Sequence, residues 1–176
     1  MSLITEVSLR VHATLTKASD LGADTEDDLD FVHRVRLLSG TTAGKADKLW
    51  YDERTLGASA TEDLDLVGAL SDAFGATVSQ ARIKGLYVLA EPKDPDATRN
   101  TNNVVIGGAS ATQWAALLGT TGTVTVRPGC LLAVQCGELD ATGYVCAAGA
   151  TDLLKVANSA GSTGVTYQII VIGASA

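Results

Sequence analysis

Several short stretches of the chain alternate strictly between apolar and polar residues. Over residues 7–15 every second residue is apolar, and the residues between them are polar. Residues 29–37 follow the same rule in part, and they place His33 on the apolar side. A period of two is the pattern of a β-strand that buries one face. We therefore expect two half-buried strands here, separated by an acidic loop over residues 20–30.

The middle of the chain, residues 45–90, predicts further strands. Alternation favours a strand over residues 49–55, an edge strand over 61–66 and a buried strand over 82–90. Between them, residues 67–74 predict a short helix that Gly75 ends.

The remainder of the chain predicts more short strands and one more helix. A polar segment over residues 91–103 is typical of an exposed loop. After Ser110, the apolar stripe of Trp114, Leu117 and Leu118 predicts a short helix that packs its Trp on the sheet. Strands are expected over residues 123–126, 130–136, 144–146, 153–157 and 165–172.

The composition supports one mainly β domain. The chain has 176 residues, of which 46% are hydrophobic but only 5% aromatic, with 18 Gly and three Pro. Many tight turns between thin sheets of aliphatic residues are typical of sandwiches and barrels. We expect a single antiparallel β-sandwich, jelly-roll-like, over residues 1–176 with one or two short helices, and residues 1–6 as a possible extended arm.

The charge of the chain restricts its partners. A formal net charge of −7 without clustered Lys or Arg argues against direct nucleic-acid binding, which needs cations to neutralise phosphates. No apolar stretch is long enough to span a membrane, and residues 1–10 lack the pattern of a signal peptide. Synthesis in the cytoplasm and no membrane partner are the expectation.

Motifs for catalysis and for cofactors are all incomplete. The segment from Gly40 to Lys45 has one residue too few for a phosphate-binding loop and continues with Ala46. The repeated GASAT, at Gly57 and at Gly108, lacks the final Gly of a nucleophile elbow. Asp63 and Asp65 share a strand face, but an exposed acidic edge explains them more simply. We expect no enzyme and no cofactor.

Metal and disulfide chemistry find equally little support. Counted from Asp24, a calcium loop would require Gly where Leu29 stands, so a solvated acidic turn is expected, with an irregular cation site as the alternative. Cys130, Cys136 and Cys146 lack any metal-binding spacing. Free thiols are expected, while a disulfide between Cys136 and Cys146 across a hairpin stays open.

The strand over residues 49–55 carries the candidate contact residues. Trp50 and Arg54 fall on one face and Tyr51 on the other, and neither face is purely apolar. Trp, Tyr and Arg are the residue types enriched at the energetic centres of protein interfaces. We expect Trp50, Tyr51 and Arg54 to contact a partner subunit, with ordinary core packing of Trp50 as the alternative.

Several segments, in their order along the chain, resemble small structural proteins of tailed-phage virions, in particular head decoration or cement proteins. The resemblance covers most of the chain from about Leu29. The segments are KADKLWYDERTLGASATEDLDLVGALSDAFGATVSQARIKGLYVLA, VRPGCLLAV, GYVCAAGATDLLKVANSAG and YQIIVIG.

This resemblance implies a β-sandwich or jelly-roll unit that binds the exterior of a capsid as a dimer or trimer and has no catalytic residues. The major capsid protein would be its partner, and the virion its location. A tail component is the alternative within this class. A carbohydrate-binding sandwich that stacks sugars on Trp50 or Trp114 is the alternative from another class.

Overall fold

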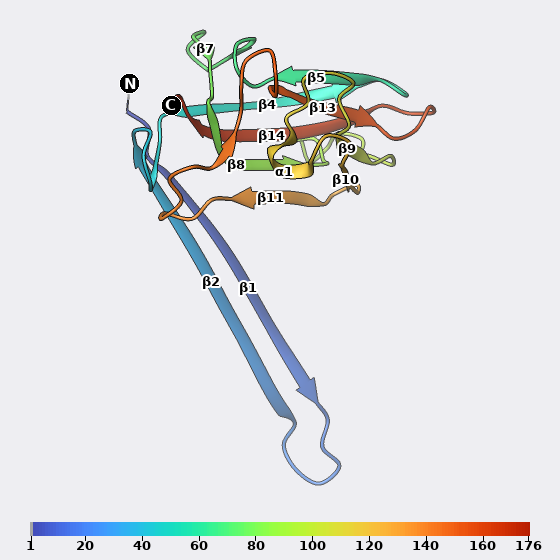
Figure 1. The fold of residues 1–176 in the computed structure, drawn as a ribbon. Helices are drawn as coiled ribbons and strands as arrows, with labels where there is room; N and C mark the ends of the chain where they lie inside the picture. Colours follow the sequence, from blue (N-terminus) through green and yellow to red (C-terminus); the bar gives the residue numbers. More distant parts are fainter. Residues whose placement is uncertain (1) are drawn as a thin grey trace.

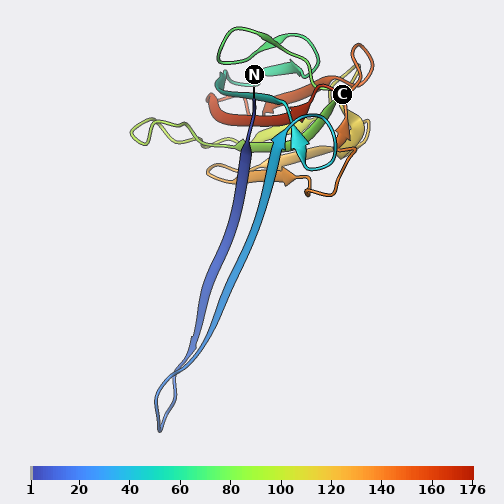
Figure 2. The ribbon, with the colours of Figure 1, turned by 90° about the vertical axis from the view of Figure 1, so that its left-hand side faces the viewer.

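The computed structural model describes residues 2–176, and two parts are visible at once: a β-sandwich body and a long β-hairpin that projects from it (Figure 1). The hairpin pairs β1 (Thr5–Lys17) with β2 (Thr25–Ser39). All of β1 is paired, from Thr5 opposite Leu37 to Lys17 opposite Thr25. We call residues 5–39 the arm. Figure 2 shows its two strands running side by side away from the body.

The arm corrects two expectations about this end of the chain. Both alternating stretches are strands, as predicted, but the expected loop over residues 20–30 is shorter because β2 begins at Thr25. Residues 2–6 are not the projecting element, because Thr5 and Glu6 already belong to the root of β1; Met1 lies outside the described residues. At its base, β2 pairs in parallel with the short β3 (Lys45–Ala46).

The body contains two antiparallel sheets. In the first, β11 (Leu131–Gln135), β8 (Arg82–Leu89), β14 (Val165–Ala174) and β4 (Lys48–Leu56) lie in that order, and β12 (Tyr144–Val145) also pairs with β8. The two central strands supply most of the pairing, because β14 is bonded on both sides along nearly its whole length. We call this the first sheet.

The second sheet has the order β10 (Thr123–Val126), β9 (Val104–Gly107), β13 (Leu153–Asn158) and β5 (Thr61–Asp65). Across both sheets the eight main strands pair in a nested way, the first with the last and so on inwards. The pairs are β4 with β14, β5 with β13, β8 with β11, and β9 with β10.

The hydrophobic core lies between these two sheets. Val165, Tyr167, Ile169 and Val171 alternate along β14 and are all buried, and they meet Val104, Ile106, Leu154 and Val156 of the second sheet. Burial of these apolar surfaces, at about 25 cal/mol per Å² removed from water, is the main force that holds the layers together. The predicted class, a mainly β antiparallel sandwich, is confirmed.

Only one of the two expected helices forms. α1 (Ala115–Leu118) confirms the prediction after Ser110, and Trp114 just before it is 2% exposed. The helix predicted over residues 67–74 is wrong, since β6 (Leu70–Ser71) turns back onto β7 (Thr77–Val78). The side chain of Asp72 accepts the N–H groups of Phe74 and Ala76, which closes a tight hairpin instead of a helical turn.

Candidate assembly interface

The arm carries a strip of apolar side chains along one face. Residues directly opposite in an antiparallel pair share a face, and the register places Val11 opposite Phe31 and Ala13 opposite Leu29. The large members of this strip are exposed to solvent: Leu9 55%, Val11 43%, Leu15 72%, Leu29 54% and Phe31 49%. The sequence predicted this face to be buried, but beyond the base of the arm nothing among residues 2–176 covers it. We call these five residues the arm strip.

The opposite face of the arm is polar and its charge is uneven. Arg10 donates to Asp30 through Nε at 2.9 Å and through its terminal nitrogen at 3.1 Å. Both side chains are exposed, so this ion pair adds little stability. Residues 14–28, around the tip, contain five carboxylates and one Lys, whereas the remaining arm residues contain three Arg and two carboxylates. The outer part is therefore strongly acidic and the inner part slightly basic.

The base of the arm is packed against the body. Val35 and Leu37, 3% and 1% exposed, form a small second core with Ala46 and Ile172, and the partly buried Leu3, Val7, Leu49 and Tyr87 pack against it. On the other side, the carboxylate of Glu138 accepts the backbone N–H of Arg36 at 2.9 Å. The arm is thus fixed at its root while its outer length stands free.

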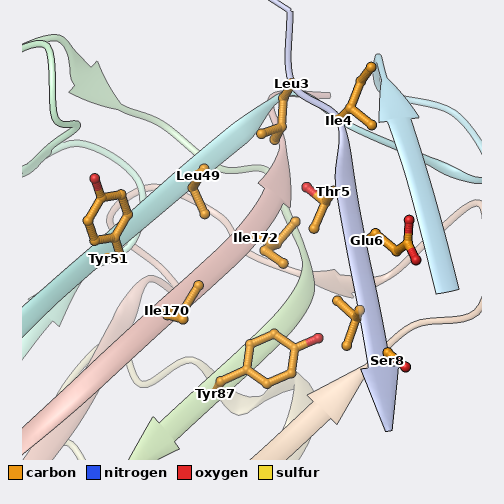
Figure 3. A pocket seen from close by; sticks show the side chains of 11 residues that line it. Leu3, Ile4, Thr5, Glu6, Ser8, Leu49, Tyr51, Tyr87, Ile170 and Ile172 are labelled. Carbon is orange, nitrogen blue, oxygen red and sulfur yellow. The ribbon is translucent and has the colours of Figure 1, made fainter. Parts of the chain in front are cut away.

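The small core sets the arm at an angle to the outer face of the first sheet. Ile170 and Ile172 point away from the sandwich core, because their neighbours Ile169 and Val171 point into it. Between this face and β1 lies a groove of about 510 Å³, which we call the base groove. Its side chains are apolar for the most part, as Figure 3 shows: Leu3, Ile4, Leu49, Tyr51, Tyr87, Ile170 and Ile172.

The apolar surface continues past the base groove. A second groove of about 640 Å³ shares Leu3, Leu49 and Tyr51 with it and reaches Phe74, which is 80% exposed. Contiguous exposed apolar surface is a feature of interaction sites, and it makes these grooves a candidate for one. The candidate interface therefore has two parts, the arm strip and the grooves at its base.

The three predicted contact residues are distributed over very different environments. Trp50 is 4% exposed and belongs to the sandwich core, so the expectation that it contacts a partner is wrong and the core-packing alternative is right. Tyr51 is 57% exposed on the opposite face, where it lines both grooves. Its contact with a partner stays a prediction. None of the arm strip residues was among the predicted contact residues, although their alternation is the clearest signal in the sequence.

Arg54 is occupied within its own chain. Its Nε donates to Glu62 at 2.6 Å and a terminal nitrogen donates to Asp52 at 3.0 Å. Glu62 also accepts the hydroxyl of Tyr167 at 2.6 Å, and Tyr167 is fully buried. Burial raises the pKa of Tyr167, and the hydrogen bond to Glu62 raises it further. This network joins the edge of the first sheet to the second sheet and has a structural role.

Trp114 is as unavailable to a ligand as Trp50. Its indole N–H donates to the carbonyl of Val145 at 3.1 Å, and its ring meets that of Tyr144 edge to face at a centroid distance of 6.1 Å. A sugar that stacks on an aromatic ring requires an exposed ring face, and neither Trp provides one. The interpretation of these two residues as a carbohydrate platform is therefore wrong.

The cysteines are unpaired thiols, and two of the three are buried. All three thiols are free, and the disulfide left open between Cys136 and Cys146 is not formed. Burial raises the pKa of Cys136 to about 11 and that of Cys146 to about 12. Across residues 2–176, no group of three or more His, Cys, Asp or Glu is placed to hold a metal ion.

Lys84 is the one fully buried cation among the described residues, and its role is to close a loop. Its amine donates to the carbonyl of Asp140 at 2.7 Å. The Asp140 carboxylate accepts the N–H groups of Gly143 and Thr142. Its pKa is lowered, first by the hydrogen bond from Gly143 and then by that from Cys136. These bonds order the loop that carries Glu138 to the base of the arm.

Comparisons with known proteins leave the interpretation to the geometry. No protein-family model matches the chain, and no curated protein or solved structure is significantly similar to it. Within the described part of the chain, no helix is long and apolar enough to cross a membrane. The surfaces described above therefore carry the functional argument.

Proposed function

We propose that this chain is a structural protein of a tailed-phage virion, a decoration or cement protein that binds the outer surface of the head and bridges major capsid subunits. The observation that carries the proposal is the arm strip on its projecting hairpin. Five large apolar side chains, each 43% exposed or more, face solvent on an element that the body fixes only at its root. Exposed apolar surface of this kind is typical of a contact with another subunit.

The strand pairing of the body supports a jelly-roll assignment. Nested pairing of the first strand with the last, the second with the seventh and so on is what results when one long antiparallel hairpin rolls into two sheets. Jelly rolls are frequent in viral capsid proteins and also in lectins. A fold by itself does not determine function. Burial of both Trp residues weighs against the lectin type, and the arm favours the assembly type.

The charge of the chain suits a protein that covers a particle at high density. A net charge of −7 keeps neighbouring copies soluble before assembly. Each copy then needs only modest contacts, because many interfaces on one particle act together and raise the overall affinity.

Reconstitution on heads tests the proposal. Heads would be purified from a deletion mutant of the source phage that lacks this coding sequence. They would be mixed with the purified chain and imaged by electron microscopy. We expect ordered additional density at local symmetry axes and a higher melting temperature of the particle. Heads that remain bare at saturating protein would refute the decoration function.

The same images separate head from tail. Immunogold labelling of complete virions with antibodies to the chain should mark the head surface. Label confined to the tail, together with rings or tubes formed by the purified chain, would instead support the tail component.

A further inference from the structure

We infer that the arm strip is covered by the arm of a second copy of this chain, packed antiparallel to it, in a two-fold symmetric dimer whose arm tips reach into the partner's base groove. The dimer consists of this chain alone and forms whether or not it then binds a capsid. It therefore goes beyond the proposed function. Four features of the arm select this partner: its strip, its charge distribution, its length and its tip.

The first feature is the arm strip itself, which can be covered only by an apolar surface of similar length. A two-stranded hairpin is marginally stable alone in water, and further strands or a packed face are needed for stability. The pairing along the arm strip is regular, since all pairs from Thr5 with Leu37 to Lys17 with Thr25 are in register. A second copy of the same strip matches it in length and chemistry.

The charge distribution selects the antiparallel orientation. The outer part of the arm, residues 14–28, has a net charge of −4, and the inner part has a net charge of +1. Arms packed in parallel would gather the acidic tips, and repulsion between exposed like charges within a Debye length of about 8 Å opposes that arrangement. Antiparallel packing separates the two acidic tips by about the length of the arm and brings each to the level of the partner's Arg34 and Arg36, which lie on the polar face. Within residues 2–176 these two Arg form no ion pair.

The area of the contact shows that the tips must take part. The free part of β1, the 10 residues from Ser8 to Lys17, is about 33 Å long and a pair of strands about 10 Å wide, so one free arm face covers roughly 330 Å². Two such faces bury about 660 Å², which is below the roughly 1,200 Å² of a stable specific interface. The two tip contacts of a symmetric dimer need to supply the remaining area of about 540 Å².

The tip has the residue that such a contact requires. Leu21, in the turn between β1 and β2, is fully exposed at 101% and is flanked by polar and acidic residues. Antiparallel arms of equal length bring each tip to the root of the partner's arm. There lies the base groove, whose lining by Leu49, Tyr51 and Ile170 is apolar (Figure 3). Leu21 of one copy entering the base groove of the other closes the interface at both ends, as two-fold symmetry requires.

Two adjacent residues of the arm supply a matched test. Phe31 and Val32 are 49% and 46% exposed, but they lie on opposite faces of β2. Phe31→Asp places a charge in the arm strip, and Val32→Asp places the same charge on the polar face. Sedimentation equilibrium of the purified full chain should give a dimer for the wild type. We expect the dissociation constant to rise at least about 100-fold for Phe31→Asp and by less than about 3-fold for Val32→Asp.

Several outcomes of this experiment would overturn the inference. The wild-type chain could stay monomeric at about 100 μM, or it could form a trimer. The two substitutions could also change the dissociation constant equally. Without urea, each variant must keep the wild-type emission spectrum of the two buried Trp residues, which reports an intact sandwich core. Because both substituted side chains are exposed in the single chain, neither substitution disturbs the sandwich core.

Cross-linking tests the orientation. In a Cys130→Ser background, chains with Leu21→Cys are mixed with chains with Tyr51→Cys and oxidised. Antiparallel arms predict a cross-linked dimer in the mixture but not in the Leu21→Cys chains alone. Cross-linking of Leu21→Cys chains to each other would show tips that meet, and would refute the antiparallel arrangement.

Discussion

Substitution of Glu62 by Ala should destabilise the fold strongly, although Glu62 lies at the margin of the sandwich. Its carboxylate accepts the hydroxyl of Tyr167 and the Nε of Arg54, both at 2.6 Å. Tyr167 is 0% exposed, so its hydroxyl cannot turn to water once Glu62 is gone. A buried donor without a partner costs the full penalty of its desolvation.

The magnitude follows from the two contacts. The unpaired hydroxyl of Tyr167 costs about 1–3 kcal/mol. The guanidinium of Arg54 is 36% exposed at its side chain and keeps Asp52 as a partner, so loss of its bond to Glu62 adds no more than about 1 kcal/mol. We expect a loss of about 1–4 kcal/mol in the free energy of unfolding, and a fall of roughly 2–15 °C in Tm.

Urea denaturation measures this loss. Trp50 and Trp114 are buried, and their fluorescence reports unfolding of the core. The measurement is made in the Phe31→Asp background, where the expected monomer makes unfolding independent of concentration.

A double-mutant cycle with Tyr167→Phe isolates the hydroxyl. In that background Glu62→Ala should cost only the contribution of Arg54, about 1 kcal/mol or less. If Glu62→Ala costs the same with and without the Tyr167 hydroxyl, within about 0.5 kcal/mol, the reasoning is refuted.

Three further predictions concern thiols, a glycine and a loop. In the native chain one thiol, the exposed Cys130, should react with a chromogenic disulfide, and all three should react after unfolding. Burial raises the pKa of Cys146 from 9.0 to about 12, so between pH 9 and pH 11 the folded state keeps a proton that the unfolded state loses. The free energy of unfolding should therefore fall from pH 9 to pH 11, and less steeply in Cys146→Ala. Gly122→Ala should cost about 2 kcal/mol or more in urea denaturation, because a Cβ there overlaps the carbonyl of Leu118, whereas Gly137→Ala, with open space around it, should be neutral. Asn100→Ala removes bonds to Ala90 and Thr166 that anchor the loop over residues 91–103, so trypsin should cut this loop about 10-fold faster or more, with exposed Thr98→Ala as the control.

Much of the body was predictable because alternation carries both the strand and its faces. The strands over residues 49–55, 82–90 and 165–172 are all present, and so is the short helix that follows Trp114. The helix predicted over residues 67–74 failed because its pattern is short. A single local interaction, the side chain of Asp72 closing a hairpin turn, outweighed the helical propensity of those residues.

The candidate interface was predictable only in part. Alternation placed Trp50 and Tyr51 on opposite faces of one strand, and that is confirmed. Each face mixes apolar and charged residues, so the sequence did not indicate which face meets the core. Packing against the second sheet decided it, with Trp50 inside and Tyr51 in the base groove.

The arm shows most clearly what each level determines. The sequence alone determined that residues 7–15 and 29–37 are strands with one apolar face each, because the period of two is a local property of the chain. Only the tertiary structure decided that these strands pair with each other and leave the body, with Leu9, Val11 and Phe31 exposed. An alternating pattern specifies that a face is apolar and not what covers it, since the covering surface is chosen by contacts distant in sequence or on another chain.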